Sequence, residues 1–520
     1  MLDAGGTGSE LCAQPLSPGH SASVRGFPVT PVDNACSEWN AHYRAAHCRA
    51  VAGPGGDVVP IAPYGCGGSY DLAQQSRRNS AVRRTRHRLA IAMPVSIPQR
   101  TGVHPMRNRT RSAMPAAVLL VMAAYLPTPA SANEARGESG PGEFTVDTTA
   151  DAVDADPSDG ECRTRTGGCS LRAAVMAANA RPGSTITLPA GRYRLTIPPN
   201  PRLIIGSHPD PSTGDLNVNA PTTIRGAGAR TTVIDANRID RAFRMRADSR
   251  LSDLTIIGGV ARQRELPFTD TGGGAIANGR HMTLKSVAVT GNSAGYGGGI
   301  FNVPGSHLDL IDSTVSGNTA GEAGGIRFDD GGTVTNSTIS DNRVTDPGDR
   351  PGSLGGYGGG LDIRGLGHVQ ILNSTVTGNS ATDGGGGINI APAYLDSLPP
   401  PITDIIDLPL GHLTLRNSII AGNTGAGTPA DCDRVFADIA SNGHNIDSDG
   451  SCGLTGEGDL PSRTALVGPL ADNGGPTDPH ALLPGSPALD AAAECPATDQ
   501  RGIPRPQGAA CDIGAYERTR

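Results

Sequence analysis

The stretch that decides the fold is a short motif that returns five times between residues 284 and 423. Every copy ends in Asn, and the copies read SVAVTGN ending at Asn292, DSTVSGN at Asn318, NSTISDN at Asn342, NSTVTGN at Asn379 and NSIIAGN at Asn423. A period of about two dozen residues, longer where segments are inserted, indicates a solenoid in which each coil contacts its neighbours.

Apolar residues alternate before each closing Asn, which predicts a strand with one buried face. They stand ten, eight and three positions before it, as in Leu308, Leu310 and Val315. A Gly-rich strand then enters the next coil, and its inward residues are Ile276, Ile300, Ile326, Leu361 and Ile388. Three short strands per coil fit an all-β parallel β-helix solenoid, whereas the frame of leucine-rich repeats is absent.

Two polar columns punctuate the coils. One is the closing Asn, and the other, six positions earlier, comprises Ser286, Asp312, Asn336, Asn373 and Asn417. We expect both columns to stack, because Asn at a repeated corner bonds to the Asn above and below and tolerates left-handed backbone angles.

The N-terminal end of the solenoid needs a cover, because unpaired strand edges invite aggregation. Ser170 is a good helix N-cap, and Leu171, Ala174, Val175 and Ala178 would share one helical face. Residues 162–180, with a helix that begins after Ser170, are therefore predicted to cover this end of the solenoid.

Residues 106–132 have the pattern of a secretory signal. Arg107, Arg109 and Arg111 precede an apolar stretch, and Ala130-Ser131-Ala132 forms a cleavage site. Residues 1–105 show no apolar period, so we interpret them as an artefact of start-site choice. A disordered basic leader is the alternative.

The charge of the remaining chain limits its partners. Residues 1–132 hold 13 Arg and 6 acidic residues, which leaves 30 basic and 44 acidic residues, a net charge of −14. An acidic surface argues against nucleic acid and anionic membranes as partners. No other apolar run is long enough to span a bilayer, and the sequence carries no signal for an oligomeric state.

Six cysteines remain after the signal and fall into three close pairs. These are Cys162 with Cys169, Cys432 with Cys452, and Cys495 with Cys511. Disulfides between near neighbours are favoured because each pair lies in a non-repetitive end segment, although six cysteines allow fifteen pairings. A zinc site is the rival interpretation, but the sequence has no C-x₂-C spacing of the kind that zinc sites commonly use.

Both ends of the mature chain resemble known domains. Cys162, then Gly168-Cys169-Ser170-Leu171-Arg172-Ala173-Ala174 and Ala178-Asn179, is similar to the CSLREA domain of bacterial secreted repeat proteins, with Ala173 in place of Glu. PLADNGGPTDPHALLPGSPALDAA from Pro469, DQRG at 499–502 and CDIGAYE at 511–517 resemble the choice-of-anchor Q domain. The coils look like the right-handed, single-stranded parallel β-helix of the pectin-lyase superfamily.

The resemblance implies a secreted or cell-surface bacterial protein. It does not imply attachment, since the sequence continues only to Arg520 beyond this motif, and it lends no catalytic residues. The expected regions are a leader (1–105), a signal (106–132), a CSLREA-like cap (133–200), a parallel β-helix (201–425) and a choice-of-anchor Q-like region (426–520).

Catalysis on a polysaccharide would need converging carboxylates for hydrolysis, or a base for a lyase. Asp329 and Asp330 are the candidates for a hydrolase, and Arg327 and Arg364 follow strands in a similar way. No complete set of partners accompanies them, and Asp-Asp-Gly-Gly is also a common turn sequence.

Calcium is the only cofactor that the sequence suggests, and the evidence is partial. Asn445, Asp447 and Asp449 begin like a calcium loop, but Gly456 stands where a bidentate Glu is required. The acidic residues Asp154, Asp156 and Asp159 are a second candidate. Both segments are also ordinary turn sequences.

The insertions at about 260–271 and 343–356, and the one from Ala391, are expected to flank a flat sheet. The leading hypothesis is therefore a non-catalytic exported protein that presents an extended surface to a polysaccharide or another cell-surface component. The alternative is a polysaccharide lyase or glycoside hydrolase of the same fold.

Overall fold

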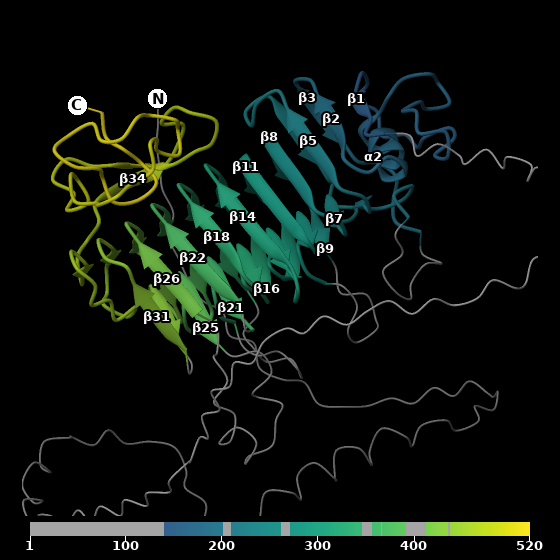
Figure 1. Ribbon diagram of the computed structural model, residues 1–520. Helices are drawn as coiled ribbons and strands as arrows, with labels where there is room; N and C mark the ends of the chain where they lie inside the picture. Colours follow the sequence, from purple (N-terminus) through teal and green to yellow (C-terminus); the bar gives the residue numbers. More distant parts are fainter. Residues whose placement is uncertain are drawn as a thin grey trace, which may run out of the picture. The chain divides into compact units, whose positions relative to one another are not determined.

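The computed structural model describes residues 140–200, 210–261, 271–345, 356–365, 367–391, 412–434 and 437–519. The predicted leader, the signal and most of the three insertions lie outside these residues. The described residues fall within one compact unit, Ala123–Arg520. They form a right-handed parallel β-helix with one capping helix, which confirms the predicted fold class (Figure 1).

Each coil crosses three sheets, and the first is an eight-stranded parallel sheet in the described part of the chain. Its inward residues stack in register, so that Ile276, Ile300, Ile326 and Leu361 pair in turn and are fully buried. The strands are β4 (Leu216–Val218), β7 (Phe243–Met245), β10 (Ile276–Asn278), β13 (Ile300–Asn302), β17 (Ile326–Phe328), β21 (Leu361–Arg364), β25 (Ile388–Ala391) and β30 (Cys432–Arg434).

The second sheet has eighteen strands in the same described residues, and most coils cross it in two segments. The strands are β1 (Glu143–Thr145), β2 (Ser184–Leu188), β3 (Gly191–Arg194), β5 (Thr222–Gly226), β6 (Thr232–Asp235), β8 (Ser249–Ile257), β11 (His281–Thr290), β14 (His307–Ile311), β15 (Thr314–Ser316), β18 (Gly332–Thr335), β19 (Thr338–Ser340), β22 (His368–Leu372), β23 (Thr375–Thr377), β26 (His412–Arg416), β27 (Ile419–Ala421), β31 (Asp438–Ser441), β32 (Ile446–Asp447) and β33 (Leu460–Pro461). Parallel pairing thus continues beyond residue 425, through β32 and β33.

The third sheet carries the short strands that come after the corner of each coil, together with β29, which pairs antiparallel with β28. They are β9 (Val260–Ala261), β12 (Ser293–Tyr296), β16 (Thr319–Glu322), β20 (Arg343–Val344), β24 (Ser380–Ala381), β28 (Thr424–Gly425) and β29 (Thr428–Pro429). A separate hairpin of β34 (Val467–Leu470) and β35 (His480–Leu482) lies after the coils.

A left-handed residue makes the corner that divides the second sheet. The backbone φ is 50° at Asp312, 47° at Asn336, 49° at Asn373 and 48° at Asn417. Because this corner separates β14 from β15, a coil has four strand segments instead of the three expected from the sequence. The prediction that this column adopts left-handed angles is confirmed.

The closing Asn residues form a continuous ladder inside the stack. In each rung a side-chain Nδ2 donates to Oδ1 of the next coil, at 3.0 Å from Asn292 to Asn318, 3.0 Å from Asn318 to Asn342, and 2.9 Å from Asn342 to Asn379. The ladder passes to Asn423 at 3.0 Å and ends on a carboxylate, Asp431, at 2.9 Å. All these Asn residues are buried.

Among the described residues the left-handed column stacks at one step, from Asn336 to Asp312, and does not continue through Asn373 and Asn417, so the prediction of a second ladder is wrong. The amide of Asn336 donates to Asp312 at 3.3 Å, but Asn417 donates to the carbonyl of Ala493 at 2.6 Å. A left-handed corner turns its side chain away from the interior of the coils. Outside the coils, carbonyl groups of residues such as Ala493 accept hydrogen bonds from this column. A serine column takes its place one position later: the backbone N–H of Ser313 donates to Ser337 Oγ, and that of Ser337 to Ser374 Oγ, both at 3.1 Å.

The predicted capping helix is α2 (Leu171–Ala180), and Ser170 accepts a hydrogen bond from the backbone N–H of Ala173. Its apolar face joins the core of the coils. Arg172 is fully buried, and its Nε lies 2.6 Å from Asp151 Oδ1. Breaking such a buried pair costs about 3–5 kcal/mol, so this Arg fixes the cap to the segment before it.

The residues after the last coil, 463–519, turn back along the stack and are called here the C-terminal region. Gln500 donates from Nε2 to Thr314 Oγ1 at 2.9 Å and accepts from Thr338 Oγ1 at 2.7 Å. Further along, the N–H of Ala515 donates to Thr375 Oγ1 at 3.1 Å. The C-terminal region therefore covers the half of the second sheet that contains β15, β19 and β23.

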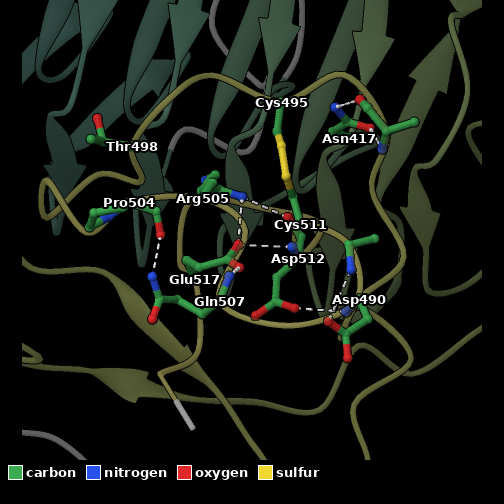
Figure 2. Close-up of a disulfide and its surroundings, with 12 residues drawn as sticks. Asn417, Asp490, Cys495, Thr498, Pro504, Arg505, Gln507, Cys511, Asp512 and Glu517 are labelled. Atoms are coloured by element: carbon green, nitrogen blue, oxygen red, sulfur yellow. Dashed lines mark hydrogen bonds and ion pairs between the residues drawn. A yellow bond between two sulfur atoms is a disulfide. The ribbon is translucent and has the colours of Figure 1, made fainter.

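Three disulfides join neighbours in the sequence: Cys162–Cys169, Cys432–Cys452 and Cys495–Cys511. Figure 2 shows the last of these beside Arg505 and Glu517. Arg505 is buried; it bonds the carbonyls of Asp512 and Gly514 at 2.7 Å each and lies 3.4 Å from Glu517. The residues of the DQRG and GAYE motifs thus have structural roles within the C-terminal region.

The Asn ladder predicts a strong effect of one side chain. Asn342→Ala should lower the free energy of unfolding by roughly 2–4 kcal/mol, because several buried donors and acceptors lose partners worth about 1–3 kcal/mol each. Denaturant unfolding followed by circular dichroism measures the change. Asn373→Gly is the matched control: Asn373 Nδ2 has no partner among the described residues, and Gly accepts its φ of 49°, so we expect a loss below about 1 kcal/mol. Equal losses in the two variants would contradict the ladder.

Candidate functional site

Asp329 lies in a cluster of charged residues on the outward side of the eight-stranded sheet. We call Glu322, Arg327, Asp329, Asp362 and Arg364 the buried ion-pair cluster. They come from the end of β16, from β17 and the residue pair after it, and from β21. Strand alternation turns Arg327 and Asp362 outward, because their neighbours Ile326 and Leu361 face the core.

Each carboxylate of the cluster is paired with an arginine. Arg327 Nε lies 2.7 Å from Asp329 Oδ1, and its NH1 lies 2.9 Å from Glu322 Oε2. Arg364 Nε lies 2.8 Å from Asp362 Oδ2, and its NH2 lies 3.9 Å from Glu322. The cluster is therefore one connected network that spans two coils.

The environment shifts two of these groups in opposite senses. Burial raises the pKa of Asp329, although Arg327 beside it acts the other way. Burial alone would lower the pKa of Arg327, but Asp329, Asp362 and Glu322 outweigh it and raise that pKa. Arg327 also stacks 4.9 Å from the ring centroid of Tyr296. The arginine thus stays charged, and Asp329 is the carboxyl of the network whose proton affinity burial increases.

Asp330 does not join this cluster. Its Oδ2 accepts from the N–H of Gly305 at 2.7 Å, and its Oδ1 accepts from the N–H of Gly331 at 2.8 Å. These bonds hold two successive turns together, as expected for a turn aspartate. The two candidates from one dipeptide therefore separate, while Glu322 and Asp362 enter the network without having been predicted.

The proposed calcium residues also separate. Asp447 and Asp449 lie with Asp431 in a group whose ligand atoms are within 4.8 Å of one another, called here the three-aspartate cluster. Asn445 is not in it: its Oδ1 accepts from the N–H of Ser418 at 3.0 Å and so continues the serine column.

Donors already occupy most oxygens of the three-aspartate cluster. Asp431 Oδ2 accepts from the N–H and Oγ of Ser448, at 2.9 and 2.5 Å, and its Oδ1 receives the end of the Asn ladder. Asp447 accepts from the N–H groups of Gly450 and Cys452. Calcium takes six to eight oxygen ligands, and few lone pairs are left here. We therefore propose that a proton on Asp447, rather than a calcium ion, reduces the repulsion among these three carboxyl groups.

The second acidic segment is built as a series of turns. Asp154 Oδ1 accepts from the N–H of Asp156 at 3.1 Å, and Asp156 Oδ1 from that of Ser158 at 3.1 Å. Asp159 Oδ1 accepts from the N–H of Glu161 at 2.7 Å. Each carboxylate satisfies the backbone two residues ahead, so the turn interpretation accounts for this segment.

The exposed part of the second sheet is a flat row of polar side chains before the left-handed corner. We call it the outer polar face. Its central row pairs in register, coil by coil, and consists of the exposed or partly exposed residues Arg250, Thr283, Asp309, Thr333 and Gln370, followed by Thr414, which is buried. The strands β11, β14, β22 and β26 lie in this sheet (Figure 1). They carry His281, His307, His368 and His412, which flank the row. At about 4.8 Å per coil, it presents one polar side chain per step.

Comparison with known proteins gives only remote similarities. Similar solved structures are pectate lyase Pel9A, with 13% identity, a TM-score of 0.33 and coverage of 74% of this chain and 98% of that chain, and the A-module of the Azotobacter vinelandii mannuronan C-5 epimerase AlgE6, with 16% identity, a TM-score of 0.24 and coverage of 61% and 95%. No protein-family profile and no curated protein matches the sequence. The CSLREA-like and choice-of-anchor Q-like assignments therefore stay predictions, and the fold rests on the parallel ladders of this chain.

The three-aspartate cluster predicts a specific pH dependence. Burial, with a hydrogen bond to Asp449, raises the pKa of Asp447 from 3.8 to about 6. The folded state therefore holds a proton that the unfolded chain releases at lower pH, and stability falls as pH rises through this window. Melting temperatures between pH 4 and 7 measure the slope.

The slope should be smaller in Asp447→Asn, even if that variant is less stable at every pH. An unchanged slope would rule out Asp447 as its source. Adding millimolar Ca²⁺ at pH 7 should leave the melting temperature of the wild-type protein unchanged, and a rise would restore the calcium hypothesis.

Proposed function

We propose that this is an exported, non-catalytic binding protein whose outer polar face holds an extended glycan or another cell-surface component. The observation that carries the proposal is the register of that face. Thr283, Asp309, Thr333 and Gln370 lie on four successive coils, are partly exposed and point the same way. A polymer with repeated hydroxyl groups meets repeated hydrogen-bonding groups there.

The rigidity of the coils supports binding through this face. The Asn ladder and the parallel pairing hold the backbone beneath it, so the protein loses little conformational freedom when a ligand binds. Hydroxyl, amide and imidazole groups both donate and accept hydrogen bonds, which suits saccharide hydroxyls.

Export is supported by the covalent cross-links. Three disulfides in one chain are typical of extracellular proteins and rare in reducing compartments. Among the described residues, the single helix has ten residues, and no helix is long and apolar enough to cross a bilayer. The proposed signal at 106–132 fits the same compartment.

A second candidate function is polysaccharide cleavage at the buried ion-pair cluster. It is favoured by burial, which raises the pKa of Asp329, because that is the direction of shift that the general acid of a hydrolase requires. Arg364 is the remaining arginine candidate for the base of a lyase, because the raised pKa of Arg327 keeps that side chain protonated. Against it, every carboxylate of the cluster is held by an arginine at hydrogen-bonding distance or close to it.

Binding is tested by probing the full chain against an array of neutral and acidic polysaccharides. For any glycan bound, the double variant Thr283→Ala with Gln370→Ala should weaken binding about tenfold, because each hydrogen bond contributes about 0.5–1.5 kcal/mol. The control is Arg343→Ala with Ser380→Ala, a paired position on the third sheet, which should leave affinity unchanged. Equal losses in both double variants, or no glycan bound at all, would contradict the proposal.

Cleavage is tested on the same polysaccharides by assaying new reducing ends and unsaturated products. We expect the wild-type protein to release no more product than Asp329→Asn. The matched control is Asp330→Asn, which alters a neighbouring carboxyl outside the cluster. Turnover that disappears in Asp329→Asn and persists in Asp330→Asn would establish the second candidate instead.

A further inference from the structure

The outer polar face carries two pairs of histidines that face each other across neighbouring strands. His281 on β11 is the register partner of His307 on β14, and His368 on β22 is the partner of His412 on β26. The two pairs have the same backbone arrangement. They differ two residues later, where the first pair has Asp309 and the second has Thr414 and Gln370.

Both imidazoles of the first pair converge on one carboxylate. His281 Nε2 lies 2.8 Å from Asp309 Oδ2, and His307 Nε2 lies 3.2 Å from Asp309 Oδ1. The rings are nearly perpendicular, at 86°, with centroids 5.1 Å apart. The three ligand atoms lie within 4.8 Å of one another. Two nitrogen atoms and one oxygen atom therefore surround a common point.

A neighbouring hydroxyl fixes the carboxylate. Thr333 on β18 donates from Oγ1 to Asp309 Oδ1 at 2.6 Å. Such supporting hydrogen bonds orient the ligands of many protein metal sites. Because parallel strands at fixed register carry all four residues, the arrangement needs no rearrangement of the backbone to bind an ion.

We propose that His281, His307 and Asp309 bind a divalent transition-metal ion of the Zn²⁺ type on the outer polar face. Imidazole nitrogen with a carboxylate oxygen suits Zn²⁺, and three protein ligands leave a fourth position for water. The side chains of His281 and His307 are 55% and 43% exposed, so the ion has access from solvent. This metal site is separate from the proposed glycan binding, because its three ligands are side chains of the protein and no glycan takes part in it.

The second histidine pair separates this proposal from a general affinity of histidine for metals. His368 Nε2 lies 2.7 Å from Thr414 Oγ1, a neutral partner. A pair with the same register but without the carboxylate lacks the third ligand and is expected to bind Zn²⁺ far more weakly. The chain therefore contains its own control.

Isothermal titration calorimetry of the untagged full chain with Zn²⁺ tests the proposal. Residues 1–132 also contain four cysteines and five histidines, so the readout is the difference between variants. His307→Asn and Asp309→Asn should each bind one Zn²⁺ fewer per chain than the wild-type protein, or bind that ion with at least about tenfold lower affinity. Thr333→Val should retain the site with affinity reduced about tenfold.

The control variant His368→Asn with His412→Asn should bind Zn²⁺ as the wild-type protein does. Melting temperatures without metal show whether each variant is folded. The proposal is overturned if His307→Asn and Asp309→Asn keep the wild-type stoichiometry and affinity, or if the control variant loses as much binding as they do.

Discussion

The amide–amide hydrogen bond between successive coils is the interaction on which the rest of the structure depends. An Asn side chain buried in an apolar stack must find both donors and acceptors, and each ladder Asn finds them in the Asn of the next coil and in the backbone of the coil before. Each rung, from Asn292 to Asn423, meets this demand and fixes the register of its coil against the next. Once the register is fixed, every outward side chain falls into a row, and such rows form the surfaces discussed above.

The sequence predicts those parts of the fold that repeat. The alternating apolar residues, the closing Asn and Ser170 at the helix cap all occupy their expected places. The sequence did not show which polar column stacks, because both columns contain Asn. The difference lies in the backbone: the left-handed corner turns the side chains of its own column away from the interior, and the closing Asn residues remain inside. The serine column was not predicted, because a Ser beside a turn is common and gives no sign that it also bonds to the next coil. Ser337 does both: its Oγ accepts from the N–H of Ser313, and its own N–H donates to Ser374 Oγ.

Residues that do not repeat were harder to place. Glu322 pairs with Arg327 and Asp362 with Arg364, each within a few residues in the sequence. The two pairs lie in coils separated by an insertion, so no fixed spacing links one pair to the other. Asp431 follows a strand without the motif, yet it ends the ladder. The C-terminal region has no period at all, and its Gln500 contacts threonines more than 150 residues away in sequence. Contacts of this kind depend on shape, which a single sequence does not display.

The C-terminal region gives the two halves of the second sheet different roles. Beyond the left-handed corner, the hydroxyl groups of Thr314, Thr338 and Thr375 form hydrogen bonds with the C-terminal region. Before the corner, Thr283 and Thr333 stand in a row that is partly exposed. The same residue type thus serves packing on one side of a bend and faces solvent on the other. This division leaves the outer polar face as the half of the sheet that the C-terminal region does not cover.

The Asn ladder also has a direction. Every amide passes a hydrogen bond from its nitrogen to the oxygen of the following coil, so the row of amides is polarised from one end of the stack to the other. At the last rung the recipient is Asp431, which as a carboxylate accepts but has no N–H to pass on. A negative group at the donor end of aligned dipoles is favourable, as it is at the N-terminus of a helix. The side chain of Asp431 therefore ends the row of amides, while the backbone pairing of the coils continues past it through β32 and β33. The row of amides thus has a defined end that is separate from the end of the coils.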